Sequence, residues 1–148
     1  MNHLLILSFV TTIFNGVFTS DIENEKTKIT VEITNLRNTK GSVSLGVYTN
    51  QDDFEDEKEY VLEVFPKTKT DDNGKLTVEL YLAPGTYGIA YLDDENNNGE
   101  MDFGLMLPNE GFGFSNYVHS GLSRPDFEDF QFTVGTQVTK VKIQTKYM

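Results

Sequence analysis

The sequence predicts an all-β protein: an antiparallel β-sandwich of about seven strands, immunoglobulin-like or transthyretin-like, with one long loop rich in Gly, Asn and Phe. Three observations lead to this fold class. Apolar and polar residues alternate in short runs after residue 21, turn residues separate these runs, and no long helical period occurs. The 11 Phe and 7 Tyr supply bulk for a two-layer core in the absence of Trp.

The N-terminal half has the most regular alternation. KITVEITNL and SVSLGVYT each place apolar residues at every second position, and the turn NTKG between them predicts a hairpin. The acidic segment 50–59 predicts a solvated connection with room for one helical turn. YVLEVF and KLTVELYL are two further strands, and Asn73-Gly74 between them suits a tight hairpin turn.

The C-terminal half is less regular. The corner at 83–85, APG, leads into the strand TYGIAYL. Alternation then stops at Asp93 and returns after Pro125, in FEDFQFTV and QVTKVKIQTKY. A loop of about thirty residues is uncommon in a compact domain and is usually functional or disordered. The aromatic content of this loop argues against disorder.

Residues 1–20 contain no Asp, Glu, Lys or Arg and include an apolar run from Leu4 to Phe14. The run is short for a membrane span and is typical of a secretory signal, with Thr19 and Ser20 near the cleavage point. The alternative is an uncleaved anchor or a buried first strand. We expect a signal peptide at 1–20, a single domain at 21–148, export to the periplasm or the cell exterior, and no stable membrane insertion after cleavage.

The charge and the cysteine count narrow the function classes. The formal charge of −11 belongs entirely to residues 21–148, so the domain repels phosphate backbones and attracts cations. We therefore expect no nucleic-acid partner. The absence of Cys excludes disulfides and thiolate metal sites, and an exported domain without disulfides points to a bacterial source. The partner we expect lies in the cell envelope or outside the cell.

The segment DDENNNGEMD places oxygen-bearing side chains at alternate positions, as the first nine positions of an EF-hand-type loop do. Counted from the first ligand, the candidates are Asp94, Asn96, Asn98, Glu100 through its carbonyl, and Asp102, with Gly99 at the bend. Ca²⁺ is therefore the expected cofactor. The alternative is a solvated Asn-Gly loop that needs no ion.

The candidate loop is incomplete as an EF-hand. Leu105 occupies position twelve, where a bidentate glutamate is expected, and no amphipathic helices flank the segment. The shell would need completion from Asp93, Glu110 or the acidic group Asp126, Glu128 and Asp129.

An aromatic segment follows the acidic loop. Phe112, Phe114 and Tyr117 could present a stacking surface to a cell-envelope glycan or peptide, or they could pack onto the core. The sequence leaves both interpretations open, and core packing is the commoner fate of Phe.

The residue types of a Ser-His-Asp triad also occur here, at Ser115, His119 and Asp126. The sequence offers neither a nucleophile elbow nor a strand–helix context for them, so we expect no enzyme.

Several uncommon motifs occur in one order: LAPGTYGIAYLDDENNNGEMDFGLMLPNEGFGFSN and then RPDFEDFQF. Together they resemble the bacterial exported proteins grouped as domain-of-unknown-function family 2141, and the likeness covers nearly all of the chain after the signal. Asp93 stands where that family usually has His, and Phe112 stands where it has Tyr. The resemblance implies an exported all-β domain without an established activity. The additional carboxylate of Asp93 suits cation binding.

Overall fold

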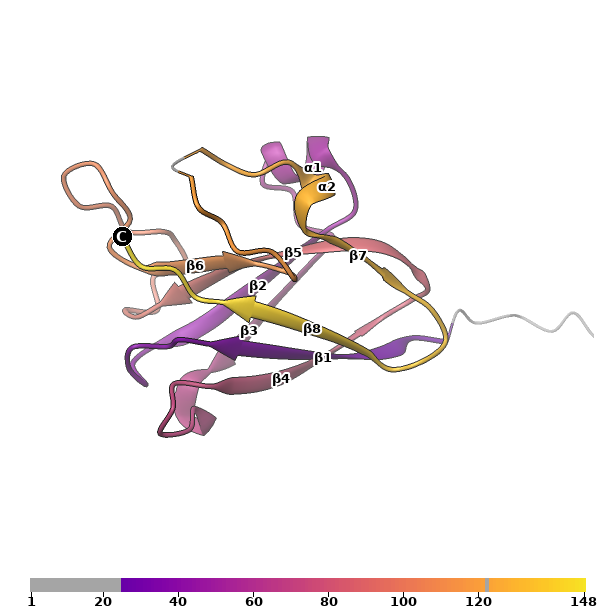
Figure 1. Ribbon diagram of the computed structural model, residues 1–148, viewed down its shortest axis with the longest axis horizontal. Coiled ribbons are helices and arrows are strands. Elements are labelled where there is room, and N and C mark those ends of the chain that lie inside the picture. The colour runs from indigo at the N-terminus through magenta and orange to yellow at the C-terminus, as the bar shows by residue number, and fades with distance from the viewer. Residues whose placement is uncertain (1–24, 122) are drawn as a thin grey trace, which may run out of the picture.

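The chain forms two packed β-sheets in a computed structural model that describes residues 25–121 and 123–148 (Figure 1). The strands are β1 Thr27–Thr34, β2 Ser42–Tyr48, β3 Val61–Pro66, β4 Leu76–Leu82, β5 Gly85–Asp94, β6 Gly111–Phe114, β7 Gln131–Val134 and β8 Thr139–Gln144. Two short α-helices, α1 Gln51–Glu55 and α2 Phe127–Phe130, and one 3₁₀ turn, η1 Lys67–Lys69, complete the elements. The all-β sandwich is confirmed, with eight strands in place of about seven. The predicted signal peptide at 1–20 lies outside the described residues.

One sheet has three strands in the order β4-β1-β8, and the other has the order β3-β2-β5-β6 with β7 also paired to β5. β1 and β8 run parallel, whereas the other named strand pairs are antiparallel. β6 and β7 share one edge of the long strand β5, β6 near its end and β7 near its start. No helix within the described part of the chain is long and apolar enough to cross a membrane.

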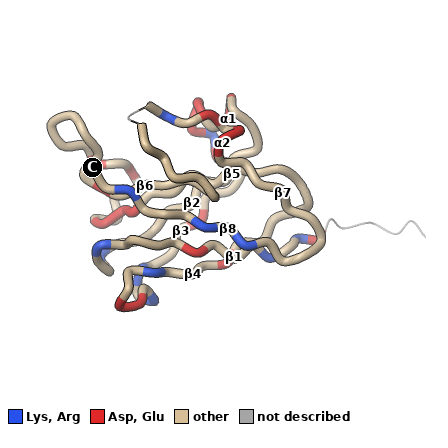
Figure 2. Tube along the Cα trace, viewed as in Figure 1, with Lys and Arg blue, Asp and Glu red and all other residues tan. Residues whose placement is uncertain are grey.

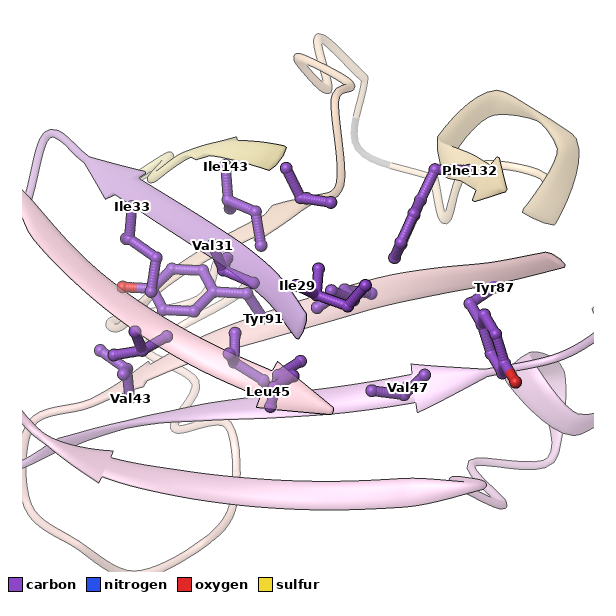
Figure 3. Close-up of a cluster of buried hydrophobic side chains, with 14 of the residues drawn as sticks. Ile29, Val31, Ile33, Val43, Leu45, Val47, Tyr87, Tyr91, Phe132 and Ile143 are labelled. Atoms are coloured by element: carbon purple, nitrogen blue, oxygen red, sulfur yellow. The ribbon is translucent and has the colours of Figure 1, made fainter. Parts of the chain in front are cut away.

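The core fills the space between the two sheets. Period-two alternation turns one face of each strand inward, so apolar side chains from both sheets meet there. β1 contributes Ile29, Val31 and Ile33 and β2 contributes Val43, Leu45 and Val47, all fully buried (Figure 3).

The two predicted hairpins are wrong. β1 and β2 belong to different sheets, and so do β3 and β4 on either side of Asn73-Gly74. Alternation indicates that a strand has one buried face, but it does not distinguish a neighbour in the same sheet from a strand across the core. The turn near Gly74 instead meets the chain after β1, because the Leu36 amide donates to the Gly74 carbonyl over 2.9 Å.

The strand predicted over FEDFQFTV is only half correct. FEDF forms α2, because Phe127 and Phe130 lie three residues apart and both are buried. The Asp126 amide donates to the Asp129 carboxylate over 3.2 Å at the start of this turn. Only the second half, Gln131–Val134, is a strand.

A strand also lies inside the predicted thirty-residue loop. In β6, Gly111 and Gly113 occupy the positions that face the C-terminal segment, where a Cβ would come within 2.5 Å of Thr145 and 2.8 Å of Gln144. In β6, therefore, glycines alternate with phenylalanines. The alternation of apolar and polar residues that predicts a strand is absent from this segment.

Aromatic rings form a second cluster on the outer face of the five-stranded sheet, beneath α1 and α2. Its buried members are Tyr48, Phe54, Phe114, Phe127 and Phe130. The rings of Phe54 and Phe130 meet edge to face with centroids 4.9 Å apart. Gly88 lies below them without a side chain, since a Cβ there would come within 2.5 Å of the Phe130 ring. This sheet thus buries part of both its faces.

Candidate functional site

The acidic loop begins at the last residue of β5. Asp94 is only 2 % exposed, and its two carboxylate oxygens accept hydrogen bonds from the amides of Asn98 (3.1 Å) and Gly99 (2.8 Å). Asn97 and Gly99 have positive φ of 59° and 79°, which turns the chain back over this carboxylate. The sequence motif therefore forms a curled loop around its first residue.

The side chains at the next alternate positions converge on one another. The Asn96 amide donates to Asp102 Oδ2 over 2.5 Å, and the Asn98 amide donates to Asp102 Oδ1 over 3.0 Å. The two amide oxygens accept from backbone N–H groups of Asn98 and Glu100. The Glu100 side chain is exposed, so its predicted contribution would come from the backbone carbonyl. The structure thus brings Asn96, Asn98 and Asp102 together.

Glu110 closes the loop from the other side. It directly precedes β6 and is 4 % exposed. Its Oε1 accepts from the Glu95 amide over 2.8 Å and its Oε2 accepts from the Asp102 amide over 3.2 Å. Of the three possible additional ligand groups, Glu110 is the one whose carboxylate reaches both arms of the loop.

Three carboxylates at this loop, those of Asp94, Asp102 and Glu110, have no basic partner among the described residues, whereas Glu95 pairs with Arg37. Asp94 and Glu110 are nevertheless buried, and a buried carboxylate is stable only where hydrogen bonds or a counter-ion offset its desolvation. In the described ranges, no three His, Cys, Asp or Glu side chains converge closely enough to hold a metal ion by themselves. A cation here would therefore depend on amide and carbonyl oxygens as well.

Asp93, a possible additional ligand, points to a separate buried site. Its Oδ1 lies 2.5 Å from Lys67 Nζ, and both side chains are fully buried. The Tyr147 hydroxyl donates to its Oδ2 over 2.6 Å, and Lys67 Nζ also donates to Asn38 Oδ1 over 3.1 Å. Burial and then the Asp93 carboxylate raise the pKa of Tyr147, so this hydroxyl keeps the proton that it donates. Both Asp93 oxygens are therefore already engaged.

A second ion pair fixes the entrance of the loop. Arg37 Nε lies 2.6 Å from Glu95 Oε1, and the Arg37 guanidinium also donates to the Asn109 carbonyl over 2.9 Å. The same guanidinium lies 4.4 Å from the centre of the Tyr147 ring. The hydrogen bond from Arg37 is the main cause that lowers the pKa of Glu95. Sequence reasoning found neither Arg37 nor Lys67, because no local motif links them to the loop.

The acidic group Asp126, Glu128 and Asp129 is not brought to the loop. Glu128 and Asp129 lie in α2 and Asp126 directly precedes this helix, whose Phe130 lies over Gly88. Gly88 is six residues before Asp94 along β5, which corresponds to roughly 20 Å of strand.

The aromatic candidates divide between two places. Phe112 and Phe114 line a groove on the outer face of the five-stranded sheet, with a volume of about 780 Å³. Tyr117 lines a smaller recess of about 340 Å³ beside β8. Phe114 is buried, as the core-packing interpretation predicts, although it packs on the outer face of the sheet. Phe112 and Tyr117 are half-buried.

Ser115 has a structural position. Its hydroxyl donates to the Phe130 carbonyl over 2.5 Å and accepts from the Ile89 amide over 2.9 Å, and the residue is fully buried. It therefore links β5 to α2.

The family described as "Uncharacterized protein conserved in bacteria (DUF2141)" matches residues 31–142, which include most of the sandwich, the acidic loop and most of the residues that line the groove. Comparisons with curated proteins and with solved structures gave no match.

Proposed function

Because the chain belongs to this bacterial family, whose description assigns no activity, we propose a function from the loop geometry: an exported, non-catalytic β-sandwich protein that binds Ca²⁺ at the Asp94–Asp102 loop. The observation that carries the proposal is the pair of buried carboxylates, Asp94 and Glu110, which lack a basic partner in the described chain. A divalent cation would supply the missing positive charge. Export is supported by the signal-like residues 1–20.

The expected shell combines side-chain and backbone oxygens. Asp94, Asn96, Asn98 and Asp102 supply side-chain oxygens, Glu100 supplies its carbonyl, and Glu110 takes the place of the absent position-twelve glutamate. The two Asn amide groups, which donate to Asp102 without an ion, would rotate to present their oxygens. The three carboxylates do not converge without an ion, so cation binding would have to draw them together, and we expect a dissociation constant of about 10⁻⁴ to 10⁻³ M, as in extracellular modules.

Calcium is expected to raise the melting temperature of the protein. At a free concentration roughly ten times the dissociation constant, ligand linkage adds about 1.4 kcal/mol to the free energy of unfolding. For a domain of this size the shift is about 4 °C. Differential scanning fluorimetry of the protein in EGTA and then in millimolar CaCl₂ measures it.

Two variants locate the site. Asp102→Asn removes one negative ligand and should abolish most of the calcium-dependent shift, whereas Glu100→Gln should retain it because only the Glu100 carbonyl is used. Asp71→Asn is a matched control, since Asp71 also accepts backbone amides in a turn but lies between η1 and β4. A melting temperature that is the same in EGTA and in calcium would show that the loop is held by its own hydrogen bonds alone.

A further inference from the structure

The groove on the outer face of the five-stranded sheet has an apolar and adaptable lining. Phe54, Phe112 and Phe114 contribute aromatic surface, and five residues of the segment 101–108 form one wall. Three of the four methionines in the chain, Met101, Met106 and Met148, line this one groove. Methionine side chains are flexible and polarisable, so they adjust to different apolar partners. This lining suits a ligand with several apolar side chains.

The apolar surface continues out of the groove onto the loop that projects beside the C-terminus (Figure 1). Leu105 is fully exposed, Met106 is 86 % exposed and Phe103 is 66 % exposed. This tip is ordered, because the Gly104 amide donates to the Leu107 carbonyl over 2.8 Å and Phe103 pairs with Pro108. Clustered exposed apolar residues on an ordered turn mark an interaction site. A segment of polypeptide covers a groove and its projecting wall better than a small molecule does.

The rim of the groove is acidic. Glu57, Glu59 and Glu100 line it, and acidic residues gather around α1 and α2, while the projecting tip carries no charge (Figure 2). Arg124 also lines the groove, but its guanidinium already donates to Glu57 and to two carbonyls of α1. Arg124 offsets the charge of Glu57, but Glu59 and Glu100 form no ion pair within the described residues, so the field at the groove favours a positively charged occupant.

The same charges disfavour other occupants. Two copies of this chain, each with a formal charge of −11, would bring acidic rims together. A glycan needs free polar groups for its hydroxyls, whereas Arg124 is paired with Glu57 and the Glu59 carboxylate accepts from the Tyr48 hydroxyl over 3.1 Å.

We propose that this groove binds a segment of another protein in which apolar side chains alternate with Lys or Arg. The apolar side chains would lie on the methionines and Phe112, and the basic groups would reach the acidic rim. The groove shares Gly99, Glu100 and Met101 with the calcium loop, so peptide binding is measured in EGTA, where no calcium is bound.

A fluorescein-labelled peptide of alternating Leu and Lys is the probe, and its Leu-Glu counterpart is the charge control. Fluorescence anisotropy with the purified protein should give micromolar binding of the Leu-Lys peptide and none of the Leu-Glu peptide. Met106→Ser should weaken binding about tenfold, because it removes exposed apolar contact area without changing charge. Leu62→Ser is the matched control, since Leu62 is 58 % exposed on β3 and does not line the groove.

Four outcomes would overturn the proposal. One is the absence of Leu-Lys binding, and another is equal binding of the Leu-Glu peptide. A third is an equal effect of Met106→Ser and Leu62→Ser, which would mean that the peptide does not bind specifically at this groove. Binding of a neutral oligosaccharide in place of the peptide would identify a glycan site. Because all of these measurements are made in EGTA, failure of the peptide proposal is distinguishable from failure of the calcium proposal.

Discussion

Lys67→Met is expected to lower the free energy of unfolding by about 3–5 kcal/mol, because it leaves the Asp93 carboxylate buried without its cation. Both side chains have no exposed surface, and Nζ lies 2.5 Å from Oδ1. Methionine fills much the same volume as lysine, so the loss comes from the unpaired charge and not from a cavity. Urea denaturation followed by circular dichroism measures the change.

Two further variants isolate the cause. Lys75→Met breaks the exposed pair with Glu32, in which the two side chains are 41 % and 35 % exposed, and should cost no more than about 1 kcal/mol. Lys67→Met combined with Asp93→Asn removes both charges and should recover more than half of the loss, since the Tyr147 hydroxyl retains an acceptor. A single Lys67 variant as stable as the Lys75 variant would contradict the assigned role of the buried pair.

The strands with one clearly buried face could be predicted from the sequence. β1, β4 and β8 each alternate buried and less buried positions, and this alternation predicts them as strands. Val31, Val78 and Val141 lie side by side in these three strands, and all three are buried. What could not be predicted is the sheet to which each strand belongs. Pairing depends on contacts between distant segments, such as the parallel pairing of β1 with β8, and no local pattern encodes it.

The candidate loop could likewise be predicted only where its residues lie close together in the sequence. Asp94, Asn96, Asn98 and Asp102 lie within one turn of chain, so their spacing alone indicates that they converge. Glu110 could be proposed from the sequence only as one of several acidic residues, because its contact with Glu95 and Asp102 depends on β6 pairing with β5. Lys67 was not predictable, since it reaches Asp93 only through the pairing of β2 with both β3 and β5.

The second large effect is expected at a glycine that contacts the candidate loop. Gly41→Ala should lower the free energy of unfolding by about 3 kcal/mol, from steric overlap together with strain at positive φ. Gly41 has φ of 70°, and a Cβ on it would lie 2.0 Å from the Asp94 carbonyl oxygen. That oxygen belongs to backbone, so the overlap is relieved only if the end of β5 moves. Chemical denaturation gives the loss of stability, and the calcium-dependent melting shift should decrease with it.

Gly99→Ala is the control that separates the two contributions. Gly99 has φ of 79°, but a Cβ on it would have no neighbouring atom within 4 Å. Gly99→Ala should therefore lower the free energy of unfolding by about 1 kcal/mol, from backbone strain alone. The difference between the two variants therefore measures the close approach of Gly41 to Asp94. If Gly41→Ala costs no more than Gly99→Ala, the end of β5 can shift freely, and Asp94 is not held in a fixed position for a ligand. If the difference is about 2 kcal/mol, the close packing of Gly41, just before β2, fixes the first residue of the candidate loop before any cation binds.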